Sequence, residues 1–295
     1  MSAPAPGAVP DRRPADAPLD AVADALPLWL ERAVHQVFPA GSGRIDDAFS
    51  ARHFSDLAGE YGRAYRPELA PAGAGNTFAA MARSLVESAG LDRWPVGVAI
   101  AAHATPDLDC RYAAATYLSE AWPDGPLSFG VSEQGTATPF AALRLAGAYA
   151  RRHGLRKALV LVLDQATLPY ATGAELGGDA GVALLLSADP VAGVRPLVRH
   201  TPGVAVEDLR ALLAGQLAPF GPDTAVVAGP GIDPGRDLPA GLGEVRETGK
   251  GFPCTALWAA YAAGAPAGRP LALVDHDPVS GDLGVCVTGS QEPPR

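Results

Sequence analysis

Residues 128–150 have the order expected of a turn that carries a catalytic nucleophile. The stretch SFGVSEQGTATPFAALRLAGAYA begins as a buried strand, continues as a short polar turn and ends as a long apolar helix. Side chains in such a turn lie beside unpaired helix amides, where many enzymes place a nucleophile. The turn, called the elbow below (residues 132–137), contains Glu133, Gln134, Gly135 and Thr136 but no cysteine. It is therefore either a catalytic turn with an unusual nucleophile or the frame of a lost site.

Three other side chains lie at positions where proteins often place catalytic or binding groups. Cys254 follows Pro253 at the start of an apolar helix, where helix amides would lower the pKa of an exposed thiol; the sequence favours packing in the core instead. His103 ends a buried strand, on the side of a sheet where α/β sites gather, and a structural histidine near a subunit interface is favoured. Lys250 either binds a phosphate or carboxylate or caps a surface loop.

Two further candidates have plain structural interpretations. His276 is flanked by Asp275 and Asp277, but sequential carboxylates in a turn are typical of a solvated loop, and no metal site is expected. The Thr136 hydroxyl is inert at its ordinary pKa without a neighbouring base, and no histidine is placed by the sequence to serve. We expect Thr136 to have a structural role or to cap the helix that follows it.

Composition and charge exclude several classes of protein. The 295 residues carry a net charge of -9, which argues against nucleic-acid or anionic-membrane partners. Cys110, Cys254 and Cys286 lie far apart in the sequence, with no C-x-x-C spacing and no even count, so neither a disulfide framework nor a zinc site is indicated. Cys110, in a helix's first turn, and Cys286 are expected to be buried. No apolar stretch reaches the ~20 residues of a membrane span, so we expect a soluble, cytoplasmic protein.

An internal repeat organises the chain. TPFAALRLAGAYARRHGLRKALVLVLDQ and GFPCTALWAAYAAGAPAGRPLALVDHD share P-x-x-A-L, a tyrosine, a glycine-containing break and an apolar run that ends in aspartate, at Asp164 and Asp275. The prolines of the two segments, Pro139 and Pro253, lie 114 residues apart, and each segment continues into G-D-x-G-V. One unit, a helix followed by two strands, is predicted to occur twice.

The repeat predicts an α/β fold with covered sheets. KALVLVL and PLALV are continuously apolar, which is typical of strands buried on both faces by helices. Before residue 76 the pattern is weaker, and WLERAVHQVFPAG fits the first strand or a helix. We predict a Pro/Ala-rich flexible tail over residues 1–24, a first half over 25–190 and a second half over 191–295.

These landmarks resemble those of the thiolase-fold condensing enzymes, in particular ketoacyl synthases of type III and their degenerate relatives. The resemblance rests on residues 77–90, AHATPD (102–107), the elbow with its flanking strand and helix, GGDAGVALLLS (177–187) and ETGKGFPCTAL (247–257). It implies a layered α-β-α-β-α fold built from two halves related by a pseudo-dyad. It covers roughly residues 76–290.

The family's catalytic triad is absent at the matching positions. The resemblance implies a nucleophilic Cys at the elbow, a His after the strand TAVVAGPG and an Asn in a Gly-Asn pair before the last helix. Counting back along the helix places Thr136 where the Cys belongs, Pro230 lies in the Gly-Pro-Gly that replaces the His, and Lys250 stands at the Asn position. Gln134 invites comparison with ketosynthases in which Gln replaces Cys and only decarboxylation remains.

Three functions are left open. The first is a non-catalytic partner of an active ketosynthase, similar to chain-length-factor-like subunits, in polyketide or other secondary metabolism. The second is an acyltransferase or decarboxylase whose rewired site uses Gln134, Thr136, Lys250 or Cys254, acting on acyl carrier protein or CoA thioesters. The third is a homodimeric scaffold or ligand-binding module. No bound cofactor or metal is expected.

Overall fold

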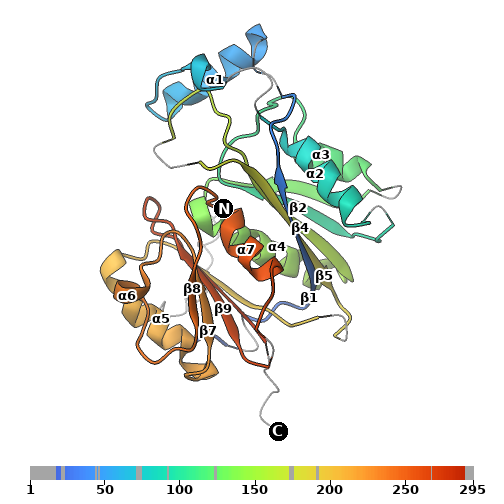
Figure 1. Ribbon diagram of the computed structural model, residues 1–295. Coiled ribbons are helices and arrows are strands. Elements are labelled where there is room, and N and C mark those ends of the chain that lie inside the picture. Colours follow the sequence, from blue (N-terminus) through green and yellow to red (C-terminus); the bar gives the residue numbers. More distant parts are fainter. Residues whose placement is uncertain are drawn as a thin grey trace, which may run out of the picture.

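Two five-stranded sheets lie one above the other, with helices between them and on their outer faces (Figure 1). The computed structural model describes residues 18–20, 24–43, 45, 47–70, 75–91, 93–122, 125–172, 176–190, 193–266 and 268–289. Helices α4 (Thr138–His153) and α7 (Thr255–Ala262) occupy the central layer. The predicted layered α-β-α-β-α fold is confirmed.

The first sheet has the strand order β1-β5-β4-β2-β3. Helices α2 and α3 cover its outer face, and α1 projects beyond it (Figure 1). The bounds are β1 Trp29–Phe38, α1 Ala48–Glu60, α2 Phe78–Ser88, β2 Val98–His103, α3 Ala114–Glu120, β3 Leu127–Val131, β4 Lys157–Asp164 and β5 Asp179–Ser187.

The second sheet has the order β6-β10-β9-β7-β8, which is the order of the first sheet with each number raised by five. Its bounds are β6 Leu197–Thr201, α5 Leu209–Leu217, β7 Ala225–Ala228, α6 Pro234–Asp237, β8 Val245–Glu247, β9 Leu271–His276 and β10 Leu283–Thr288. Strand directions also correspond, because the pairs β2–β3, β2–β4, β7–β8 and β7–β9 are parallel and the others are antiparallel. The repeat read from the sequence is therefore a repeat in structure.

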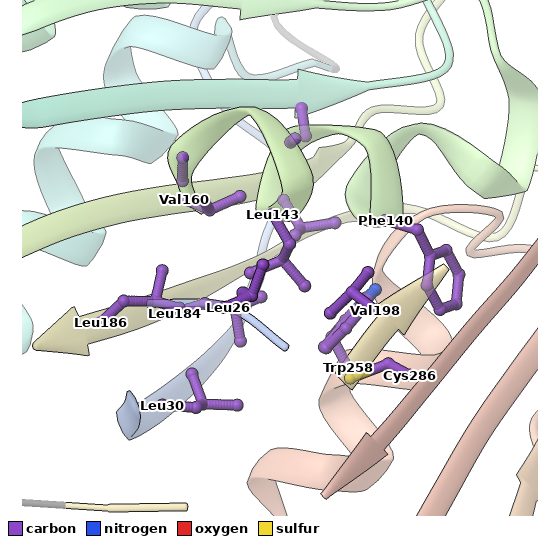
Figure 2. Close-up of a cluster of buried hydrophobic side chains, with 14 of the residues drawn as sticks. Leu26, Leu30, Phe140, Leu143, Val160, Leu184, Leu186, Val198, Trp258 and Cys286 are labelled. Atoms are coloured by element: carbon purple, nitrogen blue, oxygen red, sulfur yellow. The ribbon is translucent and has the colours of Figure 1, made fainter. Parts of the chain in front are cut away.

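The central layer explains why the paired strands are apolar throughout. Every residue of β5, β9 and β10 is buried, because helices cover both faces of each sheet. Side chains of both halves meet between the sheets, where Leu143, Val160 and Leu184 lie in one cluster with Val198 and Trp258 (Figure 2). The rings of Phe140 and Trp258 lie 5.4 Å apart and join α4 to α7. The two halves share one core.

Several local expectations need correction or completion. The ambiguous segment before residue 40 is the strand β1. Cys110 lies in a turn before α3 and is half-buried, so it is neither helical nor a core residue, whereas Cys286 is fully buried in β10. Most of the predicted tail over residues 1–24 lies outside the described residues, but Leu19 is buried in the second half. None of the described helices has the length and apolar character of a membrane span.

Candidate functional site

The elbow connects β3 to α4 through a short 3-10 turn, Gly135–Ala137. Glu133 has a φ of 65°, which makes it the one non-glycine residue of the described chain in the left-handed region. Such a conformation costs on the order of 1–3 kcal/mol and persists where neighbours fix it. Here the Tyr61 hydroxyl, at the end of α1, donates a hydrogen bond of 3.0 Å to Glu133 Oε1. The turn thus keeps the sharp geometry of a nucleophile-bearing turn.

A carboxylate of the second half accepts a hydrogen bond from the backbone amide that such a turn would otherwise offer to a substrate. The Thr136 amide donates to Asp277 Oδ2 at 3.2 Å. Asp277 is itself fixed, because its Oδ1 accepts from the amides of Val279 (2.9 Å) and Ser280 (3.0 Å). Thr136 does not cap α4, which has no side-chain cap; Thr138 instead donates to the Gly135 carbonyl. The expected capping role is wrong because the 3-10 turn displaces Thr136 from the helix start.

Asp164, at the end of β4, occupies the amino terminus of α7 across the boundary between the halves. Its carboxylate accepts from the Cys254 amide at 3.1 Å, and from the Thr255 amide and hydroxyl at 2.7 Å each. Burial raises the pKa of Asp164 to about 6, against the lowering effect of these hydrogen bonds. A carboxylate at a helix amino terminus also interacts favourably with the helix dipole.

Cys254 lies between these carboxylates and is not a nucleophile in this state. It is 1% exposed, and its thiol donates to the Gly135 carbonyl over 3.7 Å. Burial raises the pKa of the Cys254 thiol well above its usual value, and the charges of Asp164 and Asp275 raise it further. A thiol in such surroundings stays protonated and unreactive. The geometry fits the packing role that the sequence favoured.

The loop after β7, where the family's His belongs, encloses the side chain of Asp275. The Gly231 amide donates to Asp275 Oδ1 at 3.0 Å, and a Cβ atom at Gly229 would collide with the same carboxyl group. Asp275 and His276 are each 1% exposed, so the expected solvated loop is wrong at these two positions. The reason is that β9 extends through His276, whose Nε2 donates to the Val204 carbonyl at 3.0 Å. Burial raises the pKa of Asp275 to about 7.

A cavity of about 490 Å³ opens at the elbow, and we call it the elbow cavity. Glu133, Gly135 and Asp277 form part of its wall, together with two residues from the α1 region, Tyr61 and Arg63. Among the residues that line it there is no cysteine and no histidine. It can bind a small molecule, but its hydroxyl groups, among them that of Ser280, have no histidine in the lining to activate them for acyl transfer.

The structure separates the residues that the sequence put forward. Thr136 and Cys254 adjoin Asp275 and Asp277, and Pro230 lies in the loop around Asp275. The other candidates line three different cavities. Gln134 lines one of about 400 Å³, Lys250 lines another of about 400 Å³, and His103 lines a third of about 220 Å³. His103 does not line the elbow cavity, and its Nδ1 forms a hydrogen bond of 2.7 Å with the Thr105 carbonyl.

Sequence reasoning missed the carboxylates as a group. Asp164 and Asp275 were visible as the ends of repeated apolar runs, but nothing in the sequence showed that each strand end reaches the loops of the other half. Nothing in the sequence pointed to Tyr61, and Glu133 was placed in the elbow without a role. No group of metal-ligating side chains occurs in the described part of the chain.

Solved structures with similar folds were found, although no protein-family model and no curated sequence matches the chain. The tetronic acid condensing enzyme AbyA1 superposes with a TM-score of 0.60 at 16% identity, covering 89% of this chain and 100% of that one. The acyltransferase ChlB3 gives 0.53 at 16% identity, over 90% and 98%. The 3-oxoacyl-(acyl carrier protein) synthase III of Pseudomonas aeruginosa gives 0.50 at 15% identity, over 90% and 99%. The chain has the thiolase-like fold of these condensing enzymes.

Proposed function

We propose that this chain is a ketosynthase-like subunit of acyl-chain biosynthesis, of the polyketide or fatty-acid type, that performs no condensation and pairs with an active ketosynthase. The observation that carries the proposal is the filled elbow, in which Asp277 accepts a hydrogen bond from the Thr136 amide and the adjoining thiol, that of Cys254, is buried. The fold of the condensing enzymes supports the assignment to acyl-chain chemistry.

Electrostatics argue against condensation at this elbow. Decarboxylative condensation develops negative charge on a thioester oxygen, which enzymes stabilise with preorganised hydrogen-bond donors. Around Cys254 the carboxylates of Asp164, Asp275 and Asp277 contribute negative potential instead. An anionic intermediate would therefore be repelled where the family's mechanism needs attraction.

The first sheet ends in a strand that can join a partner. β3 is an edge strand, paired with β2 on one side only, and Leu127 at its start is 48% exposed. Phe129 is half-buried, with its ring 5.2 Å from that of Tyr149 on α4. An open edge with apolar side chains is a template for pairing with another strand. We propose that a homologous ketosynthase subunit adds its own strand here.

Intact-mass spectrometry tests the absence of catalysis. After incubation with acetyl-CoA, malonyl-CoA or malonyl-acyl carrier protein, the mass of the purified chain is expected to stay unchanged, because no activated nucleophile faces the elbow cavity. A ketosynthase that keeps its elbow cysteine is the positive control. A stoichiometric acyl adduct on this chain alone would overturn the proposal.

A charge on the β3 edge is expected to prevent pairing. Leu127→Asp should abolish co-purification with a cysteine-bearing ketosynthase from the same genome, because a buried unpaired carboxylate at the junction costs several kcal/mol. Val245→Asp is the matched control, since Val245 is 39% exposed on β8, the corresponding edge of the second sheet. Equal loss with both variants, or a stable homodimer that excludes the ketosynthase, would contradict the proposal.

A second candidate function rests on one contact. The side chain of Thr136 lies next to the carboxyl of Asp275, and burial raises the pKa of Asp275 to about 7, which suits a general base. An acyltransferase with Thr136 as nucleophile would show an acyl adduct that disappears in Thr136→Ala and persists in Cys254→Ala. A decarboxylase would instead release carbon dioxide from malonyl thioesters without any adduct.

A further inference from the structure

A second cavity, remote from the elbow cavity in its lining residues, lies between the two halves beside α7. Its volume is about 400 Å³, and we call it the α7 cavity. One wall comes from the end of β1, at His35 and Val37, and another from β8 and the segment that follows it. The elbow cavity and the α7 cavity share no lining residue. Ligand binding in one is thus separable from binding in the other.

The α7 cavity combines cationic and hydroxyl groups on one side. Lys250 and Arg246 both line it, and no described residue forms an ion pair or a hydrogen bond with the Lys250 ammonium group. Arg246 lies 3.7 Å from the Glu244 carboxylate, so its charge is partly compensated. The Thr248 hydroxyl is inaccessible to water and has no hydrogen-bond partner among the described residues. The Thr248 side chain would have to turn before this hydroxyl could meet a ligand, so the ammonium group of Lys250 is the group placed to bind an anion.

The remaining charges do not cancel this cationic side. Glu247 is the one carboxylate among the lining residues, against Lys250 and Arg246. Burial lowers the pKa of the His35 imidazole below its usual value, which works against a positive charge on this side chain. In a protein with a net charge of -9, a locally cationic cavity favours an anionic ligand.

The opposite side of the α7 cavity is apolar. Ala256, Ala259 and Ala260 are half-buried on one face of α7, where their small side chains leave the space open. Phe252 adds an aromatic wall. A volume of this size with an apolar lining and a few convergent polar groups is typical of small-molecule sites.

We propose that the α7 cavity binds a small amphipathic carboxylate. Lys250 holds the carboxylate group, and the hydrocarbon body lies on the alanine face of α7 and on Phe252. The site needs neither a nucleophile nor a partner subunit, and it is independent of what happens at the elbow. Free acids with a medium-length hydrocarbon body match both its charge and its volume.

Isothermal titration calorimetry with sodium octanoate on the full chain tests this site. We expect saturable binding of one octanoate per chain, at least tenfold weaker binding of octan-1-ol, and no binding of inorganic phosphate, which lacks the apolar body. Lys250→Gln should weaken octanoate binding about tenfold, the order expected for loss of a charge-assisted hydrogen bond. Lys250 is exposed, so this variant is expected to fold.

Two helix variants locate the ligand. Ala259→Phe fills the α7 cavity and should abolish octanoate binding, whereas Ala148→Phe fills the cavity beside α4 and should leave it unchanged. The proposal is overturned if octanoate does not bind saturably, or if Lys250→Gln binds it as well as wild type. It is also overturned if Ala148→Phe removes binding and Ala259→Phe, shown to be folded by circular dichroism, does not.

Discussion

Replacing Asp164 by alanine is expected to lower the free energy of unfolding by about 3–5 kcal/mol, because it leaves several buried donors without an acceptor. The amides of Cys254 and Thr255 and the Thr255 hydroxyl all donate to this carboxylate, in a position where Asp164 is 2% exposed. Each unsatisfied donor costs about 1–3 kcal/mol, reduced where water enters the cavity left behind. Urea denaturation followed by circular dichroism gives the measurement.

Two further variants separate the carboxylate's role from a general effect of substitution. Asp164→Asn keeps an acceptor oxygen and should lose less than Asp164→Ala. Asp56→Ala removes an exposed carboxylate whose nearest Arg52 nitrogen lies 3.8 Å away, and should change stability by less than about 1 kcal/mol. If Asp164→Ala were as stable as Asp56→Ala, the cap across the halves would not be a major source of stability.

The stability of the Asp275→Asn variant relative to wild type is expected to increase with pH. Burial raises the pKa of Asp275 to about 7, above the ordinary value near 3.8, so the folded protein binds a proton there that the unfolded chain has already released. This contribution to the stability of wild type is complete below about pH 3.8 and is lost progressively as the pH rises from there through 7. Asparagine cannot ionise and does not lose stability in this way.

The quantity to compare is the difference in unfolding free energy between Asp275→Asn and wild type, because other groups also make the stability of wild type depend on pH. Burial lowers the pKa of His35, His103 and His200, and these groups favour the folded state as the pH rises, which opposes the carboxyl effect. Between pH 5 and pH 8 we expect the difference in unfolding free energy to shift by about 1 kcal/mol or more in favour of Asp275→Asn. A difference that does not change with pH would show that Asp275 titrates normally.

The sequence predicted the fold from features that are local and repeated. Continuous apolar runs identified β4, β5, β9 and β10, and the P-x-x-A-L segments identified α4 and α7. β1 was ambiguous because its residues alternate irregularly between half-buried and exposed, so neither a helical nor a strand period dominates. The repeat predicted one unit, a helix followed by two strands, in each half, whereas the common strand order of the two sheets was seen only in the structure.

The candidate site was harder to predict because it depends on contacts between the halves. Counting along α4 placed Thr136 at the elbow, but its amide's partner, Asp277, is 141 residues away. Lys250 was assigned to the same site because it stands at the family's Asn position before the last helix, yet it lines the α7 cavity instead. Gly251 follows Lys250 in the chain. It has a φ of 97° and packs against the backbone of Gly177, where a Cβ atom would be crowded.

The position of α4 and α7 decides how the chain can be divided. α7 contacts β1, β4 and β5 of the first sheet as well as β7 and β9 of the second, and α4 contacts β6 and β10 as well as β2, β3 and β4. A fragment that stops after β5 would leave one apolar side of α4 in water, and its complement would leave the same on α7. We expect neither piece to fold in isolation. The two pieces should regain their structure only when they associate, so the chain would behave as a split protein.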